Sequence, residues 1–243
     1  MSAIPLALDD VLLRPDIWRG DRLAGLAAES VASGFAALDA ELPGSGWPRG
    51  ALVELLPETR GIGELSLLVP ALQQCVLDEL PVVVVAPPGM AHAPAWAARF
   101  PLIHVLVVEA ESGKGRDDIA WSVELLLASG GVGAVLAWLP AKISNKSLRR
   151  LQLAAEGSRS LAFMFRPPSC EQTSSPAPLR LSLHGSRQGL QVDIFKRRGP
   201  PCEKTLLLQV ERPLPWARVR HEAPRVLPQR QPQLAVVAKE LAK

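Results

Sequence analysis

A turn that carries Gly61 and Gly63 constrains this chain more than any other feature. It follows a strand-like apolar stretch, Val53–Leu56, and precedes a helical pattern. A strand, a glycine-rich turn and a helix are the elements of a phosphate-binding loop. Such a loop also needs a Lys for the β- and γ-phosphates and a Ser or Thr hydroxyl for Mg²⁺. Here Glu64 and Leu65 follow the turn, and a carboxylate at that place repels polyphosphate.

The residues alone leave two interpretations of this turn open. It is either a vestigial phosphate-binding loop that has lost its chemistry or an ordinary turn before a helix. A helix that starts at Gly63 would offer backbone amides to an anion. Glu64 in its first turn already takes the position that favours a negative charge. Both interpretations predict that the turn holds no cofactor and no catalytic residue.

Alternating strand and helix patterns predict an α/β fold with a mostly parallel sheet and helices on both faces. The predicted strands span 51–56, 82–86, 103–108, 134–139 and 161–165, and the predicted helices span 34–42, 63–80, 94–100, 117–129 and 145–155. The strands at 82–86 and 103–108 are continuous apolar runs, which indicates burial on both faces.

The pattern changes after residue 166. A Ser- and Pro-rich stretch over 170–178 is expected to be a mobile loop. Antiparallel strands are then predicted at 179–184, 189–197 and 206–210. They form the C-terminal edge of the predicted fold.

Composition divides the chain into an N-terminal arm (1–30), a core domain (31–210) and a Pro- and Arg-rich tail (211–243). Residues 1–195 carry 16 Lys and Arg against 20 Asp and Glu, whereas residues 196–243 carry 11 against 4. A basic C-terminal segment suits nucleic acid or an acidic partner surface. The alternative is that these charges only keep an extended segment solvated.

Several classes of protein are excluded by composition. The chain has 243 residues, 48% of them hydrophobic and 21% charged, so a packed core is expected instead of disorder. Its apolar runs fall short of the roughly 20 residues of a membrane helix, and its N-terminus lacks the basic start of a signal peptide. Three cysteines and four histidines show neither a disulfide framework nor metal-ligand spacing, and Cys75 is expected in the core. We therefore expect a cytoplasmic protein without a metal site.

Several stretches resemble the core of RecA-type recombinases. Val31–Leu38, a Gly-rich turn over 42–50 and the strand Val53–Leu56 are similar to the entry into that core, and residues 192–201 resemble its last strands. The motif Gly46-Trp47-Pro48-Arg49-Gly50, followed by the stretch at 61–66, resembles the ImuA family more closely than it resembles the recombinases. ImuA proteins are RecA-like accessory proteins of bacterial mutagenic translesion synthesis. The resemblance covers residues 30–210 and implies a RecA-like core.

The resemblance also implies where the catalytic parts of a recombinase would lie. The phosphate-binding Lys would fall at or beside Glu64. The glutamate that polarises the attacking water would follow strand 82–86, and the aspartate that orients Mg²⁺ would end strand 134–139. The second place carries Pro87-Pro88-Gly89 and the third carries Trp138 and Pro140, without a carboxylate. Each loss costs orders of magnitude in rate, so ATP hydrolysis is not expected.

Two groups of cations are candidate binding sites for a partner protein or DNA. The resemblance places the loop after strand 134–139 where recombinases face DNA. Lys146, Arg149 and Arg150 share one face of the next helix, although an ordinary solvated face is the alternative. The C-terminal group is rich in Arg, which favours bidentate binding of phosphate or carboxylate, and its Trp could stack on a base or anchor in a partner. Its members are Arg197, Arg198, Trp216, Arg218, Arg220, Arg225 and Arg230.

Residues and resemblance together predict a non-catalytic RecA-like adaptor of the SOS-type DNA-damage response and error-prone translesion synthesis. The resemblance implies as partners an ImuB-type polymerase-like adaptor, an error-prone DNA polymerase and the RecA recombinase, with DNA as a further candidate. The alternative is a SulA-like inhibitor that acts on the cell-division GTPase, since SulA proteins also have a degenerate RecA-like core. A third interpretation, a nucleotidase with unusual ligands, lacks acids at the expected strand ends.

Overall fold

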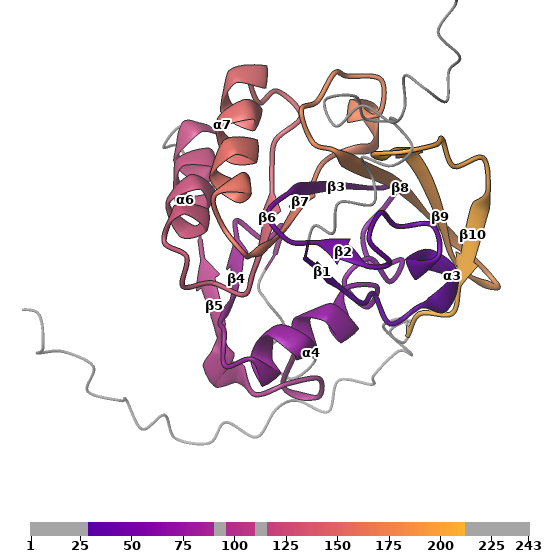
Figure 1. Ribbon diagram of the computed structural model, residues 1–243, viewed down its shortest axis with the longest axis horizontal. Helices are drawn as coiled ribbons and strands as arrows, with labels where there is room; N and C mark the ends of the chain where they lie inside the picture. Colours follow the sequence, from indigo (N-terminus) through magenta and orange to yellow (C-terminus); the bar gives the residue numbers. More distant parts are fainter. Residues whose placement is uncertain (1–28, 90–95, 110–115, 212–243) are drawn as a thin grey trace, which may run out of the picture. The chain divides into compact units, whose positions relative to one another are not determined.

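A computed structural model describes residues 29–89, 96–109 and 116–211 (Figure 1). These residues form an α/β fold around an eight-stranded sheet, with a two-stranded antiparallel sheet of β1 (Ser30–Val31) and β2 (Trp47–Pro48) beside it. The strands of the large sheet are β3 (Leu52–Pro57), β4 (Val82–Val85), β5 (Val105–Val108), β6 (Ala134–Trp138), β7 (Leu161–Phe165), β8 (Leu179–Ser186), β9 (Gly189–Lys196) and β10 (Thr205–Leu208). The predicted α/β class is confirmed.

The large sheet is mostly parallel, as predicted. Its strand order is β10-β9-β8-β3-β7-β6-β4-β5. Six strands are parallel to one another, namely β5, β4, β6, β7, β3 and β8. β9 is antiparallel to both β8 and β10. The predicted antiparallel strands at the C-terminal edge are therefore confirmed. β3 lies between two parallel neighbours and is buried from Leu52 to Leu56, as expected of a central strand.

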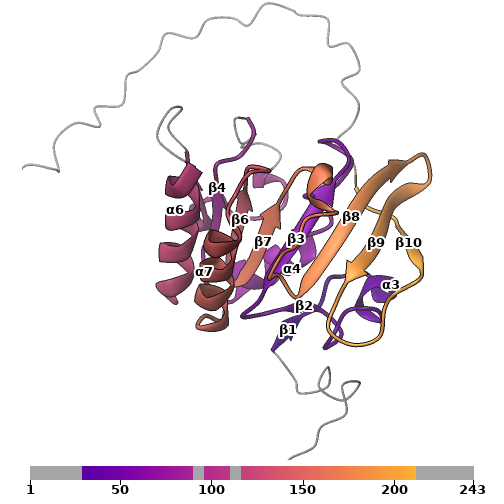
Figure 2. The ribbon, with the colours of Figure 1, turned by 90° about the horizontal axis from the view of Figure 1, so that it is seen from above.

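Helices cover both faces of this sheet (Figure 2). α4 (Val69–Leu77) lies on one face, whereas α6 (Arg116–Ala128) and α7 (Asn145–Glu156) lie side by side on the other. Each face has its own apolar core, one of which includes Cys75 of α4 while the other includes Val123 of α6. Burial raises the pKa of the Cys75 thiol to about 11, and its predicted place in the core is confirmed.

Short elements complete the fold at its margins. α3 (Ala36–Asp39) follows β1 within the predicted helix at 34–42. Two 3₁₀ turns, η1 (Leu102–His104) and η2 (Pro168–Cys170), precede β5 and follow β7. The predicted helix at 94–100 lies partly outside the described residues, as do most of the arm and almost all of the tail.

β5 corrects one prediction, because it is not buried on both faces. It is the last strand in the order of the sheet, and Leu106 and Val107 are 52% and 44% exposed. An apolar run shows that a strand is hydrophobic but not whether it lies at the centre or the edge of a sheet. β4, the other continuous apolar run, is buried at every position from Val82 to Val85.

The segment at 170–178 is a loop, as predicted, but three of its side chains pack into the fold. Cys170, Ser175 and Ala177 are buried. Arg180 donates hydrogen bonds to the backbone oxygens of Cys170 at 2.8 Å and Thr173 at 3.1 Å. A buried guanidinium needs several acceptors, and here the carbonyl groups of this segment supply them.

A buried carboxylate connects three strands of the sheet. Glu54 on β3 is fully buried, and its Oε2 accepts a hydrogen bond from Arg180 Nε at 2.7 Å. Its Oε1 accepts from Ser175 Oγ at 2.6 Å and from Arg166 Nη1 at 3.3 Å. Arg166 directly follows β7 and Arg180 lies on β8, the two neighbours of β3. Because a buried charge is costly unless it is paired, these ion pairs stabilise one register of the three strands.

The cluster carries more positive than negative charge, and further contacts compensate for this. The Arg180 guanidinium lies 4.8 Å from the centre of the Phe195 ring, an attractive cation–π contact. Arg166 Nη2 donates to the backbone oxygen of Ala141 at 3.2 Å. Lys196 Nζ donates to the backbone oxygen of Ser175 at 2.6 Å, and burial, with the charge of Arg180, lowers the pKa of Lys196.

Replacement of Glu54 by Gln is expected to destabilise the protein by about 3–5 kcal/mol, because two buried guanidinium groups lose their counter-ion. Urea unfolding followed by circular dichroism measures this difference. Glu203→Gln changes an exposed carboxylate and serves as the control, with an expected change below about 0.5 kcal/mol. Equal unfolding midpoints for the two variants would contradict the role assigned to Glu54.

Candidate functional site

The glycine turn lies between the carboxyl end of β3 and α4. Gly61 and Gly63 have φ angles of +77° and +105°, a region that favours glycine. The Glu64 carboxylate accepts hydrogen bonds from the Gly61 amide at 3.0 Å and from the Gly63 amide at 3.1 Å. In a phosphate-binding loop, backbone amides of this kind hold phosphate oxygens. Here a carboxylate of the chain itself occupies them.

Further contacts fasten the turn to its neighbours. Glu58 accepts a hydrogen bond from the Gly185 amide at 2.6 Å, and its other oxygen lies 3.2 Å from His184 Nδ1. Ile62 packs so closely on Gly185 that a Cβ there would lie 2.9 Å from Ile62 Cγ2. Arg60 Nη1 donates to the backbone oxygen of Pro88, beyond β4, at 3.3 Å. The turn is therefore held between the ends of β8 and β4 without a ligand.

The helix after the turn starts later than predicted. α4 begins at Val69, with Pro70 in its first turn, whereas the sequence pattern placed its start at Gly63. Pro is favourable in the first turn of a helix, and this marks the observed start. Residues 64–68 form turns, with Leu67 and Leu68 buried. The helix N-terminus therefore does not lie at the glycines, and the predicted start of this helix at Gly63 is wrong.

The strands beside the turn carry no acid where they end. β4 is followed by Ala86, which has a φ of +49°, and by Pro87. β6 ends at Trp138, whose ring stacks on Phe165 with 4.5 Å between ring centres. A carboxylate for water or Mg²⁺ is therefore missing at both places among the described residues.

The three cations predicted on the helix at 145–155 lie exposed on α7 but differ in their contacts. Lys146 and Arg149 have no ion-pair partner among the described residues. Arg150 is held by Glu124 of α6, with Nε 3.3 Å from Oε1 and Nη2 2.5 Å from Oε2. Arg150 therefore links two helices, and Lys146 and Arg149 remain free to bind. Their role in binding a partner or DNA stays a prediction.

The C-terminal cations lie mostly outside the described residues, which end at 211. The residues of this group that lie outside the described ranges are Arg218, Arg220, Arg225 and Arg230, together with the uncharged Trp216. Arg197, which is described, is bound by Glu41, with Nη1 2.9 Å from Oε2. This hydrogen bond lowers the pKa of the Glu41 carboxyl group, and Cys202 and Lys204 lower it further. Arg198 is exposed and lines a pocket.

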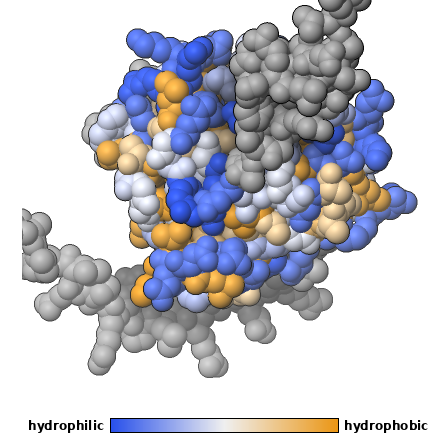
Figure 3. Space-filling model, in the orientation of Figure 1, coloured by the Kyte–Doolittle hydropathy of each residue, from blue (hydrophilic) through white to orange (hydrophobic). Residues whose placement is uncertain are grey.

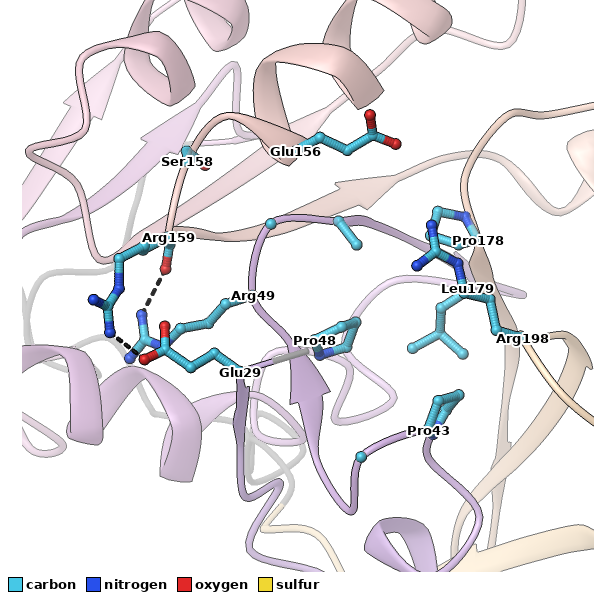
Figure 4. Close-up of a pocket in the computed structure, with 13 residues that line it drawn as sticks. Glu29, Pro43, Pro48, Arg49, Glu156, Ser158, Arg159, Pro178, Leu179 and Arg198 are labelled. Carbon is cyan, nitrogen blue, oxygen red and sulfur yellow. Dashed lines mark hydrogen bonds and ion pairs between the residues drawn. The ribbon is translucent and has the colours of Figure 1, made fainter. Parts of the chain in front are cut away.

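That pocket, drawn in Figure 4, has a volume of about 410 Å³ and lies at the amino ends of the parallel strands. The glycine turn follows the carboxyl end of β3 and therefore lies at the opposite end of these strands. Pro48, Arg49 and Gly50 line it, so the stretch that resembles ImuA proteins forms one wall. Arg49 Nη1 donates to the backbone oxygen of Arg159 at 2.8 Å, and the Arg159 side chain is paired with Glu29. Figure 4 shows this charged group on one side and Arg198 on the other.

Neither this pocket nor the ion pairs of Glu54 were predicted from the sequence. A Glu between Val53 and Leu55 in an otherwise apolar strand was a usable signal, because a buried Glu is rare unless it is paired. No pattern in the sequence indicated the pocket, because its walls come from distant segments of the chain.

Other site types have no counterpart among the residues that the structure describes. Cys75, Cys170 and Cys202 are free thiols. Within the described ranges, His, Cys, Asp and Glu side chains form no group of three or more that could hold a metal ion. The helices in those ranges are too short or too polar to cross a membrane.

Comparison with known proteins gives a partial similarity. No protein-family model matches the chain. The chain is 40% identical over 62 residues to the cell division inhibitor SulA of Photorhabdus laumondii. The match covers 26% of this chain and 34% of that protein. Because it spans about a third of the relative, an activity of the whole relative enters below only as a proposal.

The contacts of Glu58 predict a pH dependence of stability. The Gly185 amide, and after it His184, hold the pKa of the Glu58 carboxyl group below its ordinary value of 4.5. A carboxyl group whose pKa is lowered on folding adds stability above its unfolded-state pKa, and this is lost as the pH falls through its folded-state pKa. Glu58→Gln should therefore lower the melting temperature near pH 7 and differ less from wild type near pH 3.

Thermal melting across this pH range tests the prediction for Glu58. The side chain is 39% exposed, so the expected effect stays below about 1 kcal/mol. Glu203→Gln is the control and should differ from wild type by the same small amount at both pH values. A difference between Glu58→Gln and wild type that grows as the pH falls would contradict the prediction.

Proposed function

We propose that the chain is a non-catalytic, RecA-like accessory protein of the SOS-type DNA-damage response that acts by binding other proteins during error-prone translesion synthesis. The observation that carries this proposal is the Glu64 carboxylate on the amides of Gly61 and Gly63. Amide groups that already bind a carboxylate of the chain are not available to bind phosphate oxygens. The turn then serves as structure, and the function lies in the surfaces around it.

The arrangement of the elements supports the RecA-like part of the proposal. β3 is a central parallel strand, the glycine turn follows it directly, and antiparallel strands close the same edge of the sheet as in the resemblance above. The partial identity with SulA supports the link to the SOS response, because SulA proteins are degenerate RecA-like proteins of that response.

The proposed partners are an ImuB-type polymerase-like adaptor, an error-prone DNA polymerase and the RecA recombinase, all in the cytoplasm, with DNA as a further candidate. Lys146 and Arg149 on α7, Arg198 beside the pocket, and the Arg-rich segment beyond residue 211 are the groups available for such contacts. A degenerate RecA fold could reach the recombinase by taking the place of one subunit in its filament.

A second candidate function is inhibition of cell division by action on the division GTPase. The 62-residue identity with SulA favours it, because that relative is named a cell division inhibitor. The basic segment at 211–243 argues against it, since the shorter SulA proteins lack such an extension.

We expect the purified full chain to hydrolyse no ATP, with or without single-stranded DNA, because a Lys and two carboxylates are missing. Glu64→Lys should not restore turnover, since it supplies one of three parts. Phosphate release measures this, with a RecA recombinase as positive control and an expected difference of at least about 10³-fold. Phosphate release stimulated by DNA or by a partner would refute the proposal.

Two phenotypes distinguish the candidate functions. Deletion of the gene should abolish damage-induced mutagenesis and leave division normal if the chain is a translesion accessory protein. Overexpression should produce filamentous cells if it is an inhibitor of division. Mutation frequency after ultraviolet light and cell length by microscopy measure the two outcomes, and the same strain with residues 211–243 removed shows whether the basic tail is required.

A further inference from the structure

The outer face of α6 and α7 exposes large apolar side chains. Trp121 and Leu125 on α6 are 60% and 55% exposed, and Leu153 on α7 is 59% exposed. Trp121 and Leu125 are four residues apart and share one face, away from the buried Val123. Figure 3 shows hydrophobic side chains interspersed with hydrophilic ones over these helices. Exposed apolar groups beside each other, and Trp above all, are typical of surfaces that bind proteins.

Unpaired cations border these apolar side chains. Lys146 and Arg149 on α7 and Lys142 in the loop before it are exposed, and none has an ion-pair partner among the described residues. Asp118 of α6 is the opposing carboxylate, because the carboxylate of Glu124 is bound by Arg150. Among the side chains that the structure describes, the face therefore carries a positive excess that suits an acidic partner.

A hollow of about 480 Å³ lies between the two helices at this face. Trp121, Glu124 and Asp118 line it from α6, and Lys146 and Arg150 line it from α7. The volume is sufficient for a large apolar side chain of a partner. The hollow thus places an apolar contact, the Trp121 ring, next to the cation of Lys146.

The walls of the hollow are fixed before any partner binds. Ser144 caps α7, because its Oγ accepts a hydrogen bond from the Ser147 amide at 3.0 Å. The two contacts between Arg150 and Glu124 join α7 to α6. A surface held in this way loses little conformational entropy on binding.

We propose that this face of α6 and α7 binds an acidic amphipathic segment of a partner protein. An apolar side chain of the segment sits in the hollow beside Trp121, and its carboxylates meet Lys146 and Arg149. Protein is favoured over DNA, because Leu125 and Leu153 offer apolar area that a phosphate backbone cannot use. The inference rests on the proposed function only in that the chain works by binding proteins.

Fluorescence anisotropy with the full chain tests this proposal. The probe is a fluorescein-labelled helical peptide with Leu and Phe on one face and Asp and Glu on the other. We expect saturable binding, weakened about tenfold or more by Trp121→Ala. We expect the double variant Lys146→Glu, Arg149→Glu to lose a similar factor at low salt and less at high salt, since exposed charges are screened.

Matched variants and probes distinguish binding at this face from non-specific binding elsewhere on the protein. Leu77→Ala removes an apolar side chain of 76% exposure on α4, and Arg187→Glu reverses an exposed cation between β8 and β9. Both should bind the peptide within about twofold of wild type. A peptide with Lys in place of Asp and Glu, and a single-stranded oligothymidylate, should bind more weakly than the acidic peptide.

Three results would overturn the proposal: no saturable binding of the acidic peptide, equal loss in Trp121→Ala and Leu77→Ala, or tighter binding of the oligothymidylate. Circular dichroism and thermal melting of each variant establish that it is folded. The experiment uses no damaged cells and no ATP. A failure here therefore leaves the proposed accessory function standing, and a failure of the mutagenesis experiment leaves this site standing.

Discussion

The buried carboxylate of Glu54 is the constraint on which the rest of the structure depends. It lies opposite Arg180 in the register of β3 and β8, and it also binds Arg166 beyond β7. Because the charge has no access to water, any shift of the three strands would leave it or a guanidinium unpaired. The same register brings Glu58, four residues further along, to Gly185 at the end of β8. The glycine turn is therefore placed by an ion pair that lies inside the sheet.

Two carboxylates then give this turn a structure that needs no ligand. Glu64 holds the amides of Gly61 and Gly63, and Glu58 fastens the turn to β8. A nucleotide-binding loop leaves such amides open for phosphate. In this chain their hydrogen-bond partner is intramolecular. We propose that contacts with other molecules are made by outer surfaces instead, such as the face of α6 and α7.

Much of the fold could be predicted from residue patterns, and the failures have physical causes. Val82–Val85 and the strand at Ala134–Trp138 were found because buried parallel strands are continuously apolar. β5 has the same composition but lies at an edge, which depends on the order of strands and not on its own residues. The segment at 170–178 is a loop, as its polar and Pro-rich residues predict, yet Arg180, from the next strand, binds its carbonyl groups. Of the candidate site, the missing Lys was evident, whereas the hydrogen bonds of Glu64 were not.

The sequence by itself determined in what order the strands and helices follow, and that Glu64 and Leu65 instead of a Lys follow the Gly61–Gly63 turn, because both depend on residue types and their spacing along the chain. Only the tertiary structure decided which distant side chains meet. It brought Glu54 to Arg166 and Arg180, more than a hundred residues away, and set Trp121 of one helix beside Lys146 of the next. Such contacts arise from the register of strands and from helix packing, which no local pattern encodes.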